Sequence, residues 1–119
     1  MIRHLVWHLE ALSGTGPQGP VYTLDRDYEP RAVRIHTKNA VGADMLIDIK
    51  DDGTSIFTSL PRVTKGTSDE LGDDSFSSRG LDKGSLVTLE FSSGGQGGTT
   101  VTLELTSGQE DSEVEQLAV

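Results

Sequence analysis

The residues best suited to chemistry in this sequence are carboxylates, and one group of them surrounds an Asp-Gly turn. The members of this group are Asp44, Asp48, Asp51 and Asp52. Carboxylate oxygens are preferred calcium ligands, but the run lacks the alternate-position ligands of an EF-hand loop, and Ser59 stands where that loop has its bidentate Glu. An Asp beside a Gly is typical of turn chemistry. The pattern therefore favours a turn over a calcium site.

Other acids fit solvated positions better than catalytic ones. A second group consists of Asp69, Glu70, Asp73 and Asp74, and we expect it in a solvent-exposed loop. Glycoside hydrolysis needs two carboxyl groups on facing rigid elements of a cleft, for which Asp48 could pair with Glu90 or Glu104. Each of these three falls on the polar side of an alternating strand pattern, which is the normal solvated position. We assign no catalytic residue.

The histidines do not form a metal-binding or nucleophilic motif. His4 and His8 would lie about 13 Å apart on one face of a strand, too far for one ion. His36 is the remaining histidine, and no G-x-S-x-G elbow or Ser–His arrangement is present. The chain has no Cys, so thiol chemistry and Cys-bound zinc are excluded. Trp7 could stack on a sugar, but its inward position favours the core. The sequence therefore predicts no cofactor-binding or metal-binding residue, and no cofactor.

Composition narrows the function classes further. The chain has 119 residues, a formal net charge of −9, 34% hydrophobic residues and 14 glycines. This length predicts one domain. A strongly acidic surface repels nucleic acid and anionic membranes, and no apolar run approaches the length of a membrane span. The N-terminal stretch does not resemble a signal peptide. A Gly-rich chain with few hydrophobic residues suits short strands supported by neighbours in an assembly.

Residues 44–60 contain the clearest structural signal. Met45, Ile47 and Ile49 alternate with polar or outward positions, as in a half-buried strand. The Asp-Gly step at 52–53 then predicts a hairpin turn, since Gly accepts positive φ. In the returning strand, Ser55 and Phe57 are expected on one side and Thr54, Ile56 and Thr58 on the other.

Similar alternation predicts further strands along the chain. Residues 1–12 fit a strand with Leu5, Trp7, Leu9 and Ala11 inward, although Ile2, Leu5, Val6, Leu9 and Leu12 would share a helical face. We favour the strand, because Trp7 lies off the helical stripe and no N-cap precedes the segment. Further strands are expected at 21–27, 31–38 (Val33 and Ile35 inward, Arg34 and His36 outward), 85–91 (Val87, Leu89 and Phe91 inward) and 99–106 (Val101, Leu103 and Leu105 inward). Residues 13–20 read as a loop, and the Gly-rich link at 92–98 should be mobile unless something packs on it.

Residues 61–84 give the weakest signal. We expect short strands at 62–65 and 75–77, with a mobile acidic loop between them. The whole pattern predicts an all-β fold, an antiparallel β-sandwich of about eight strands with a jelly-roll-like arrangement. Residues 1–106 should form a single domain that begins with an N-terminal strand and contact loop at 1–20. Residues 107–119 form an acidic C-terminal tail.

Three stretches resemble a family pattern. These are G-A-D-M-L-I-D-I-K-D-D-G-T-S-I-F (42–57), L-D-K-G-S-L-V-T-L-E-F (81–91) and T-V-T-L-E-L (100–105). Together they resemble small bacteriophage and prophage virion structural proteins, over roughly residues 31–106. The resemblance implies a jelly-roll-like sandwich on a tail tip, baseplate, fibre or capsid that is not an enzyme. It carries no catalytic residue.

From these features we expect a non-enzymatic virion structural protein, tail-associated (minor tail or baseplate) or else a capsid decoration protein. It would be assembled in the host cytoplasm and would contact other virion proteins and copies of itself, as a trimer or ring. The N-terminal segment, residues 13–20 and residues 107–119 are the expected contact arms. The alternative is a carbohydrate-binding module that recognises a host surface glycan, for which Tyr22 and Tyr28 are the best aromatic candidates.

Overall fold

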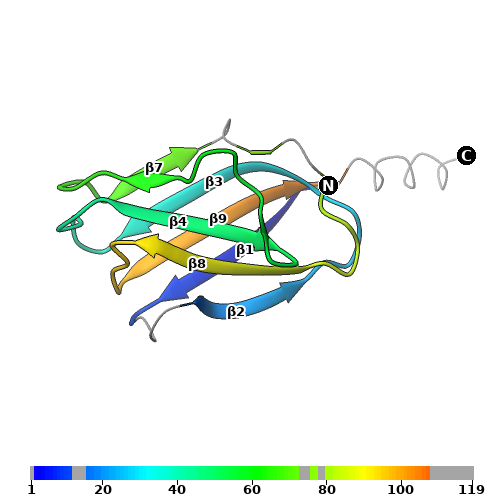
Figure 1. The fold of residues 1–119 in the computed structure, drawn as a ribbon, viewed down its shortest axis with the longest axis horizontal. Coiled ribbons are helices and arrows are strands. Elements are labelled where there is room, and N and C mark those ends of the chain that lie inside the picture. Colours follow the sequence, from blue (N-terminus) through cyan, green and yellow to red (C-terminus); the bar gives the residue numbers. More distant parts are fainter. Residues whose placement is uncertain (1, 12–15, 73–75, 78–79, 108–119) are drawn as a thin grey trace, which may run out of the picture.

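Two antiparallel sheets face each other across one hydrophobic core (Figure 1). The structure is a computed structural model, and it describes residues 2–11, 16–72, 76–77 and 80–107. The first sheet has the order β1 (Ile2–Leu9), β9 (Thr99–Thr106), β3 (Glu29–Thr37) and β7 (Asp69–Gly72). The second has the order β2 (Pro17–Thr23), β8 (Leu86–Ser93), β4 (Met45–Asp51) and β5 (Thr54–Ser55), and β6 (Arg62–Val63) also pairs with β4.

The strand pairing follows a jelly roll. The first strand pairs with the last, β2 pairs with β8, β3 pairs with β7, and β4 pairs with β5 and β6. A long hairpin that is folded over on itself gives this nesting of pairs, and it closes two sheets against each other. The predicted jelly-roll-like β-sandwich is confirmed. The described residues form nine strands, where about eight were expected.

The core consists of the inward residues of both sheets. Met45, Ile47 and Ile49 of β4 are fully buried, as are their counterparts on β9, which are Val101, Leu103 and Leu105. These six positions are the ones that the alternation predicted. Each fully buried side chain of this size contributes about 1.5–3 kcal/mol relative to an exposed one.

The N-terminal segment is a strand, as the position of Trp7 indicated. Leu5 and Leu9 are buried with it, and the indole of Trp7 is 0% exposed. Its Nε1–H donates to the carbonyl of Pro20 at 2.8 Å, which satisfies the polar atom of a buried ring. The prediction for Ala11 is wrong: the strand ends at Leu9, and Ala11 is exposed after the bend that follows.

The loop predicted at 13–20 is wrong at its C-terminal end, where β2 already begins at Pro17. Two prolines obscured this strand. They are tolerated because β2 is an edge strand that pairs only with β8. The register also shifts between Gln18 and Tyr22, and Gly19 within the shift has φ of 70°. A glycine at positive φ is typical of a bulge.

The central hairpin has the expected turn but a shorter second strand. Asp52 and Gly53 both have positive φ, 49° and 86°, as a type I′ turn requires. The returning strand stops at Ser55, so the expected alternation fails: Ile56 and Phe57 are both buried. Phe57 stacks on the ring of Phe76 at 5.3 Å, and the two residues form an isolated bridge.

The region 61–84 contains one strand that the sequence did not reveal. The short strand predicted near Arg62 is present as β6, but the expected mobile acidic loop after it contains β7. β7 is an edge strand that pairs only with β3, with His36 opposite Asp69. The strand predicted at 75–77 is reduced to the bridge at Phe76, and Ser75 lies outside the described residues. Phe91, predicted inward, lies opposite the buried Ile47 and packs against the core, although it is only half-buried.

The glycine-rich link between β8 and β9 is packed against neighbouring segments. The N–H of Gly98 donates to the carbonyl of Leu9 at 2.7 Å, and the amide of Gln96 donates to the carbonyl of Asn39 at 2.9 Å. The sequence predicted that this link would be mobile unless another segment packs on it, and these hydrogen bonds show that neighbouring segments do. Residues 108–119 of the predicted tail and residues 12–15 of the predicted contact loop lie outside the described residues.

Candidate functional site

All three histidines of the sequence lie on the outer face of the first sheet. His4 and His8 stand on β1, and His36 stands on β3. The strand register places Thr100 of β9 opposite both His8 and His36, and it places Glu104 opposite His4. The topology thus brings to one surface three residues that the sequence separates.

Each histidine has a carboxylate neighbour. His4 Nε2 lies 3.5 Å from Glu104 Oε1, His8 Nε2 lies 2.6 Å from Glu10 Oε1, and His36 Nδ1 lies 2.6 Å from Asp69 Oδ1. The hydrogen bond with His8 lowers the pKa of the Glu10 carboxyl. All three imidazoles are more than half exposed, so such pairs contribute little to stability. Within the described residues, no group of three or more potential ligands could hold a metal ion.

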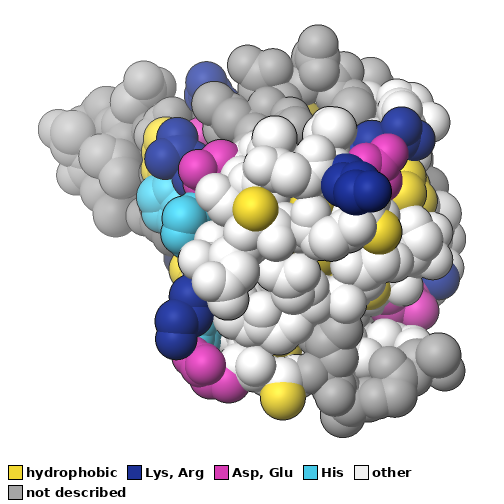
Figure 2. Space-filling model, turned by 90° about the vertical axis from the view of Figure 1, so that its left-hand side faces the viewer, with side chains coloured by type: hydrophobic (Ala, Val, Ile, Leu, Met, Phe, Trp, Pro, Cys, Tyr) yellow, Lys and Arg dark blue, Asp and Glu magenta, His cyan; other side chains and the backbone are white. Residues whose placement is uncertain are grey.

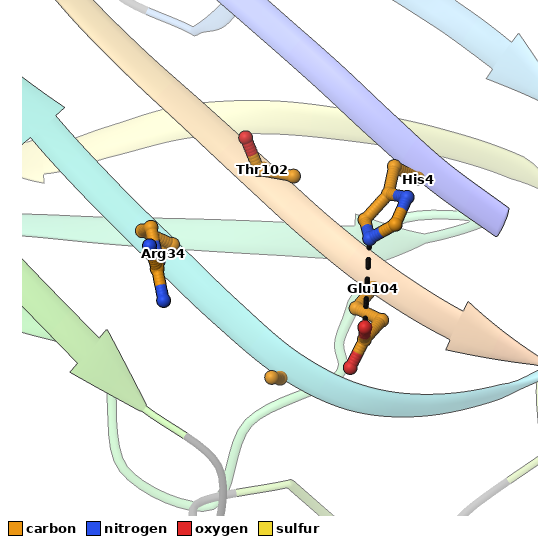
Figure 3. Close-up of a pocket in the computed structure, with 5 residues that line it drawn as sticks. His4, Arg34, Thr102 and Glu104 are labelled. Atoms are coloured by element: carbon orange, nitrogen blue, oxygen red, sulfur yellow. Dashed lines mark ion pairs between the residues drawn. The ribbon is translucent and has the colours of Figure 1, made fainter. Parts of the chain in front are cut away.

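A depression of about 430 Å³ opens on this same face, lined by His4, Ala32, Arg34, Thr102 and Glu104 (Figure 3). We call it the outer depression. Two neighbouring cross-strand rows build it: His4, Glu104 and Ala32 form one row, and Thr102 and Arg34 form the next. In the described part of the chain, the guanidinium of Arg34 has no hydrogen-bond or ion-pair partner. Alternation along residues 31–38 predicted that Arg34 points outward, but only the strand register places it on the row next to Glu104.

The carboxylates around the central turn accept hydrogen bonds from different partners. Asp44 accepts the N–H of Lys65 at 2.8 Å, and Asp52 accepts the N–H of Leu86 at 2.9 Å. Asp48 accepts the hydroxyl of Ser55 at 2.6 Å. Their oxygens thus fix turns and strand ends.

The carboxylates considered for glycoside hydrolysis do not face each other across a cleft. Asp48 and Glu90 are cross-strand neighbours on the second sheet, and Glu104 lies on the outer face of the first sheet. Glu90 forms an ion pair of 2.8 Å with Lys50, and this hydrogen bond raises the pKa of the lysine. These acids therefore occupy the two opposite outer surfaces of the sandwich.

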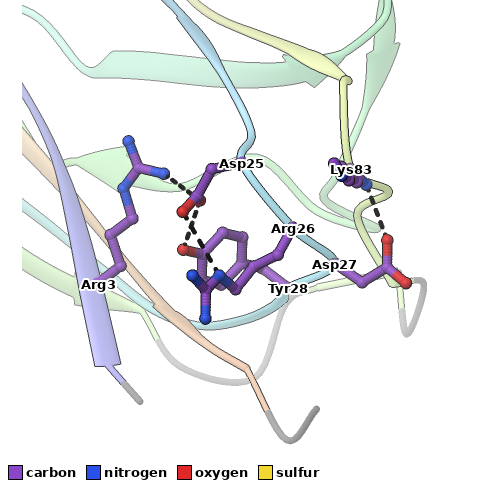
Figure 4. A network of polar contacts seen from close by, with 6 residues as sticks. All are labelled: Arg3, Asp25, Arg26, Asp27, Tyr28 and Lys83. Carbon is purple, nitrogen blue, oxygen red and sulfur yellow. Dashed lines mark hydrogen bonds and ion pairs between the residues drawn. The ribbon is translucent and has the colours of Figure 1, made fainter. Parts of the chain in front are cut away.

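A polar network that the sequence did not reveal ties β1 to the connection between β2 and β3 (Figure 4). Asp25 Oδ1 accepts from Arg3 Nη1 at 2.7 Å and from the hydroxyl of Tyr28 at 2.7 Å. The hydrogen bond from Tyr28 is the main reason why the pKa of Asp25 is lowered, and burial is the main reason why the pKa of Tyr28 is raised. Nearby, Asp27 accepts the N–H of Lys83 at 2.8 Å. The sequence signal for this network was the run D-R-D-Y at residues 25–28, which groups charged residues with a tyrosine.

The two tyrosines considered for glycan stacking have structural roles. Tyr28 is 1% exposed, so its ring cannot meet a sugar. Tyr22 is half-buried, packs edge-on against Trp7 with centroids 5.2 Å apart, and donates its hydroxyl to the carbonyl of Val6 at 2.6 Å. Tyr22 and Trp7 thereby connect the edges of the two sheets.

Figure 2 views the end of the sandwich that carries the β3–β4 and β8–β9 connections. Figure 2 shows mostly small polar residues and backbone at its centre, with histidines, basic residues and acids at the margins.

Sequence comparison adds no family assignment. No protein-family model matches the chain, and no curated protein matches it. Among the described residues, none forms a helix long and apolar enough to cross a membrane.

Proposed function

We propose that this chain is a non-enzymatic structural subunit of a bacteriophage particle, tail-associated (minor tail or baseplate) or else a capsid decoration protein. It would stabilise the particle through contacts with copies of itself and with other virion proteins. The resemblance of residues 42–57, 81–91 and 100–105 to virion proteins supports this proposal. The jelly-roll fold is compatible with it, although a fold alone does not specify a function.

The observation that carries the proposal is a set of large hydrophobic side chains that remain exposed on the edge strands β1 and β2 and on β8 beside β2. We call it the edge patch: Ile2, Val6, Val21 and Leu86, which are 42–53% exposed. The first two lie on β1, the third lies on β2, and Leu86 lies on β8 opposite Thr23 of β2. β1 and β2 are the edge strands of their sheets, and hydrogen bonds from Trp7 and Tyr22 hold them side by side.

Covering this edge would favour association. Burial of apolar surface is the dominant favourable term in most protein–protein contacts. Symmetric repetition multiplies a small patch into many contacts, and mass action then stabilises a subunit with a modest core. The ionisable residues that could suggest catalysis pair with one another on the outer surfaces or fix turns.

Light scattering and sedimentation velocity on the full chain test the proposal. We expect a symmetric oligomer, a trimer or ring, whose population rises with concentration. The double variant Val6→Glu/Val21→Glu should shift it to monomer, because both substitutions place a charge in the contact. Thr64→Glu adds a charge at an exposed position away from this edge and serves as the control.

A chain that stays monomeric at all concentrations and does not co-migrate with phage particles would contradict the proposal. So would an oligomer that Thr64→Glu dissociates as readily as the double variant does. Circular dichroism of each variant confirms that the β-sandwich is intact.

A further inference from the structure

We propose that the outer depression binds an acidic monosaccharide, meaning a sugar with one carboxylate and several hydroxyl groups. This inference goes beyond the assembly role and does not depend on it, because none of the edge-patch residues lines the depression. It rests on the cavity, on one basic side chain that has no partner among the described residues, and on an acid on the neighbouring row.

The shape of the depression follows from the cross-strand rows. Ala32 and Thr102 contribute short side chains to the lining, and Arg34, His4 and Glu104 contribute long polar ones. Figure 3 shows Arg34 on β3 and His4 on β1, on either side of Thr102 and Glu104 on β9. Rows that are two residues apart along a strand are separated by about 7 Å. Arg34 and Glu104 therefore stand on neighbouring rows with a gap between them that a single sugar ring can bridge.

Arg34 supplies recognition of a carboxylate. Its guanidinium has no hydrogen-bond or ion-pair partner within the described part of the chain, so no described residue competes with a ligand for its donors. The planar fork of a guanidinium matches the two oxygens of a carboxylate, and a bidentate pair of this kind is both stronger and more directional than a neutral hydrogen bond. A ligand carboxylate is thus the expected partner of Arg34.

Glu104 and Thr102 supply recognition of hydroxyl groups. The carboxylate of Glu104 is one-third exposed and pairs with His4 at 3.5 Å, which leaves it capacity to accept from further donors. The hydroxyl of Thr102 can donate or accept. The negative charge of Glu104 repels every anion in proportion to its charge, so it disfavours phosphate and runs of acidic residues more than a single carboxylate. It favours hydroxyl donors next to a single carboxylate, which is the composition of an acidic sugar.

The size of the depression agrees with such a ligand. Its volume of about 430 Å³ falls in the lower part of the range for small-molecule sites, roughly 300–1,000 Å³. The site is open on the outer face of a sheet, so the ligand keeps much of its contact with water. We therefore expect a dissociation constant of about 1 mM, as is usual for a few exposed polar contacts.

An NMR titration of the full, isotope-labelled chain tests the inference. D-glucuronate should shift the amide signals of residues 32, 34, 102 and 104, while D-glucose, which lacks the carboxylate, should bind about tenfold more weakly or not at all. Arg34→Gln should lower the affinity for D-glucuronate about tenfold. Arg31→Gln removes the same charge from an exposed position of the same strand, outside the depression, and should leave the affinity unchanged.

A third variant separates a sugar site from a general anion site. Inorganic phosphate should bind the unmodified chain more weakly than D-glucuronate does, and Glu104→Gln should raise the phosphate affinity. Equal binding of phosphate and D-glucuronate, equal binding of D-glucose, or an equal loss in Arg31→Gln would each overturn the inference. So would the absence of signal shifts at D-glucuronate concentrations well above 1 mM.

Discussion

Substituting Gly94 by Ala tests how firmly the link between β8 and β9 is held against the rest of the sandwich. Gly94 has φ of 66°, and a Cβ there would overlap the carbonyl oxygen of Asp44. Two other glycines separate the cost of a positive φ from the cost of the steric overlap. Gly84 has φ of 87° with nothing within 4 Å of a Cβ, whereas at Gly97 a Cβ would lie 2.5 Å from the carbonyl oxygen of Glu10 without a positive φ.

The three positions predict a ranked series of stability losses. A non-glycine residue at positive φ costs about 1–2 kcal/mol. A side-chain atom forced into a packed site costs about 1–3 kcal/mol. Replacing Gly by Ala also lowers the conformational entropy of the unfolded chain, which stabilises the folded state by about 0.4–1 kcal/mol. We therefore expect Gly94→Ala to lower the free energy of unfolding by about 2–4 kcal/mol, because both penalties apply. Gly84→Ala and Gly97→Ala should each cost less, because only one penalty applies.

Urea unfolding followed by tryptophan fluorescence measures the series directly. The chain has one tryptophan, and Trp7 is fully buried, so its emission reports the core. For a domain of this size, 1 kcal/mol corresponds to about 4 °C in Tm, so Gly94→Ala should melt about 8–16 °C below the unsubstituted chain. If Gly94→Ala is no less stable than Gly84→Ala, the link is not packed on Asp44 and the reasoning fails.

Three further substitutions test the core and the polar networks. Trp7→Phe should lower the free energy of unfolding by about 2–3 kcal/mol, because the carbonyl of Pro20 loses its donor and the smaller ring leaves a gap. This variant lacks the only tryptophan, so its urea unfolding is followed by circular dichroism, and an unchanged midpoint would contradict the prediction. Ile47→Ala should cost about 3–4 kcal/mol in the same assay, since the side chain is fully buried; a loss below 1 kcal/mol would show that the site is not core. Tyr28→Phe removes the main cause of the lowered pKa of Asp25. A carboxyl whose pKa is lower in the folded state stabilises the fold above its unfolded pKa, near 3.9, and that contribution is lost as the pH falls through the folded pKa. The difference between Tyr28→Phe and the unsubstituted chain, measured by urea unfolding, should therefore be larger at pH 7 than at pH 2.5, and a difference that is the same at both would refute this role of the hydrogen bond.

The sequence was informative where alternation was regular. β4 and β9 carry three large apolar residues each at every second position, and their inward residues could be predicted one by one. β7 could not be found, because its sequence D-E-L-G has a single large apolar residue. The first half of β2 was hidden by Pro17 and Pro20, which only an edge strand accommodates.

The outer depression could not be predicted from sequence patterns, for a different reason. Its lining residues come from β1, β3 and β9, and only the pairing register decides which outward residues become neighbours. Alternation predicted that Arg34 points outward, but it could not place Arg34 on the row next to Glu104. The Asp25 network was missed in the same way, since Arg3 meets it from a distant strand.

The pairing of the first strand with the last has a consequence for synthesis. Because β1 can complete its ladder only with β9, residues Ile2–Leu9 must wait until Thr99–Thr106 have left the ribosome. Contacts between such distant parts of a chain close slowly, and unpaired apolar strands promote aggregation during the delay. Nascent chains that stall before residue 99 should therefore hold Trp7 in water, and release of the last strand should be the event that shields it.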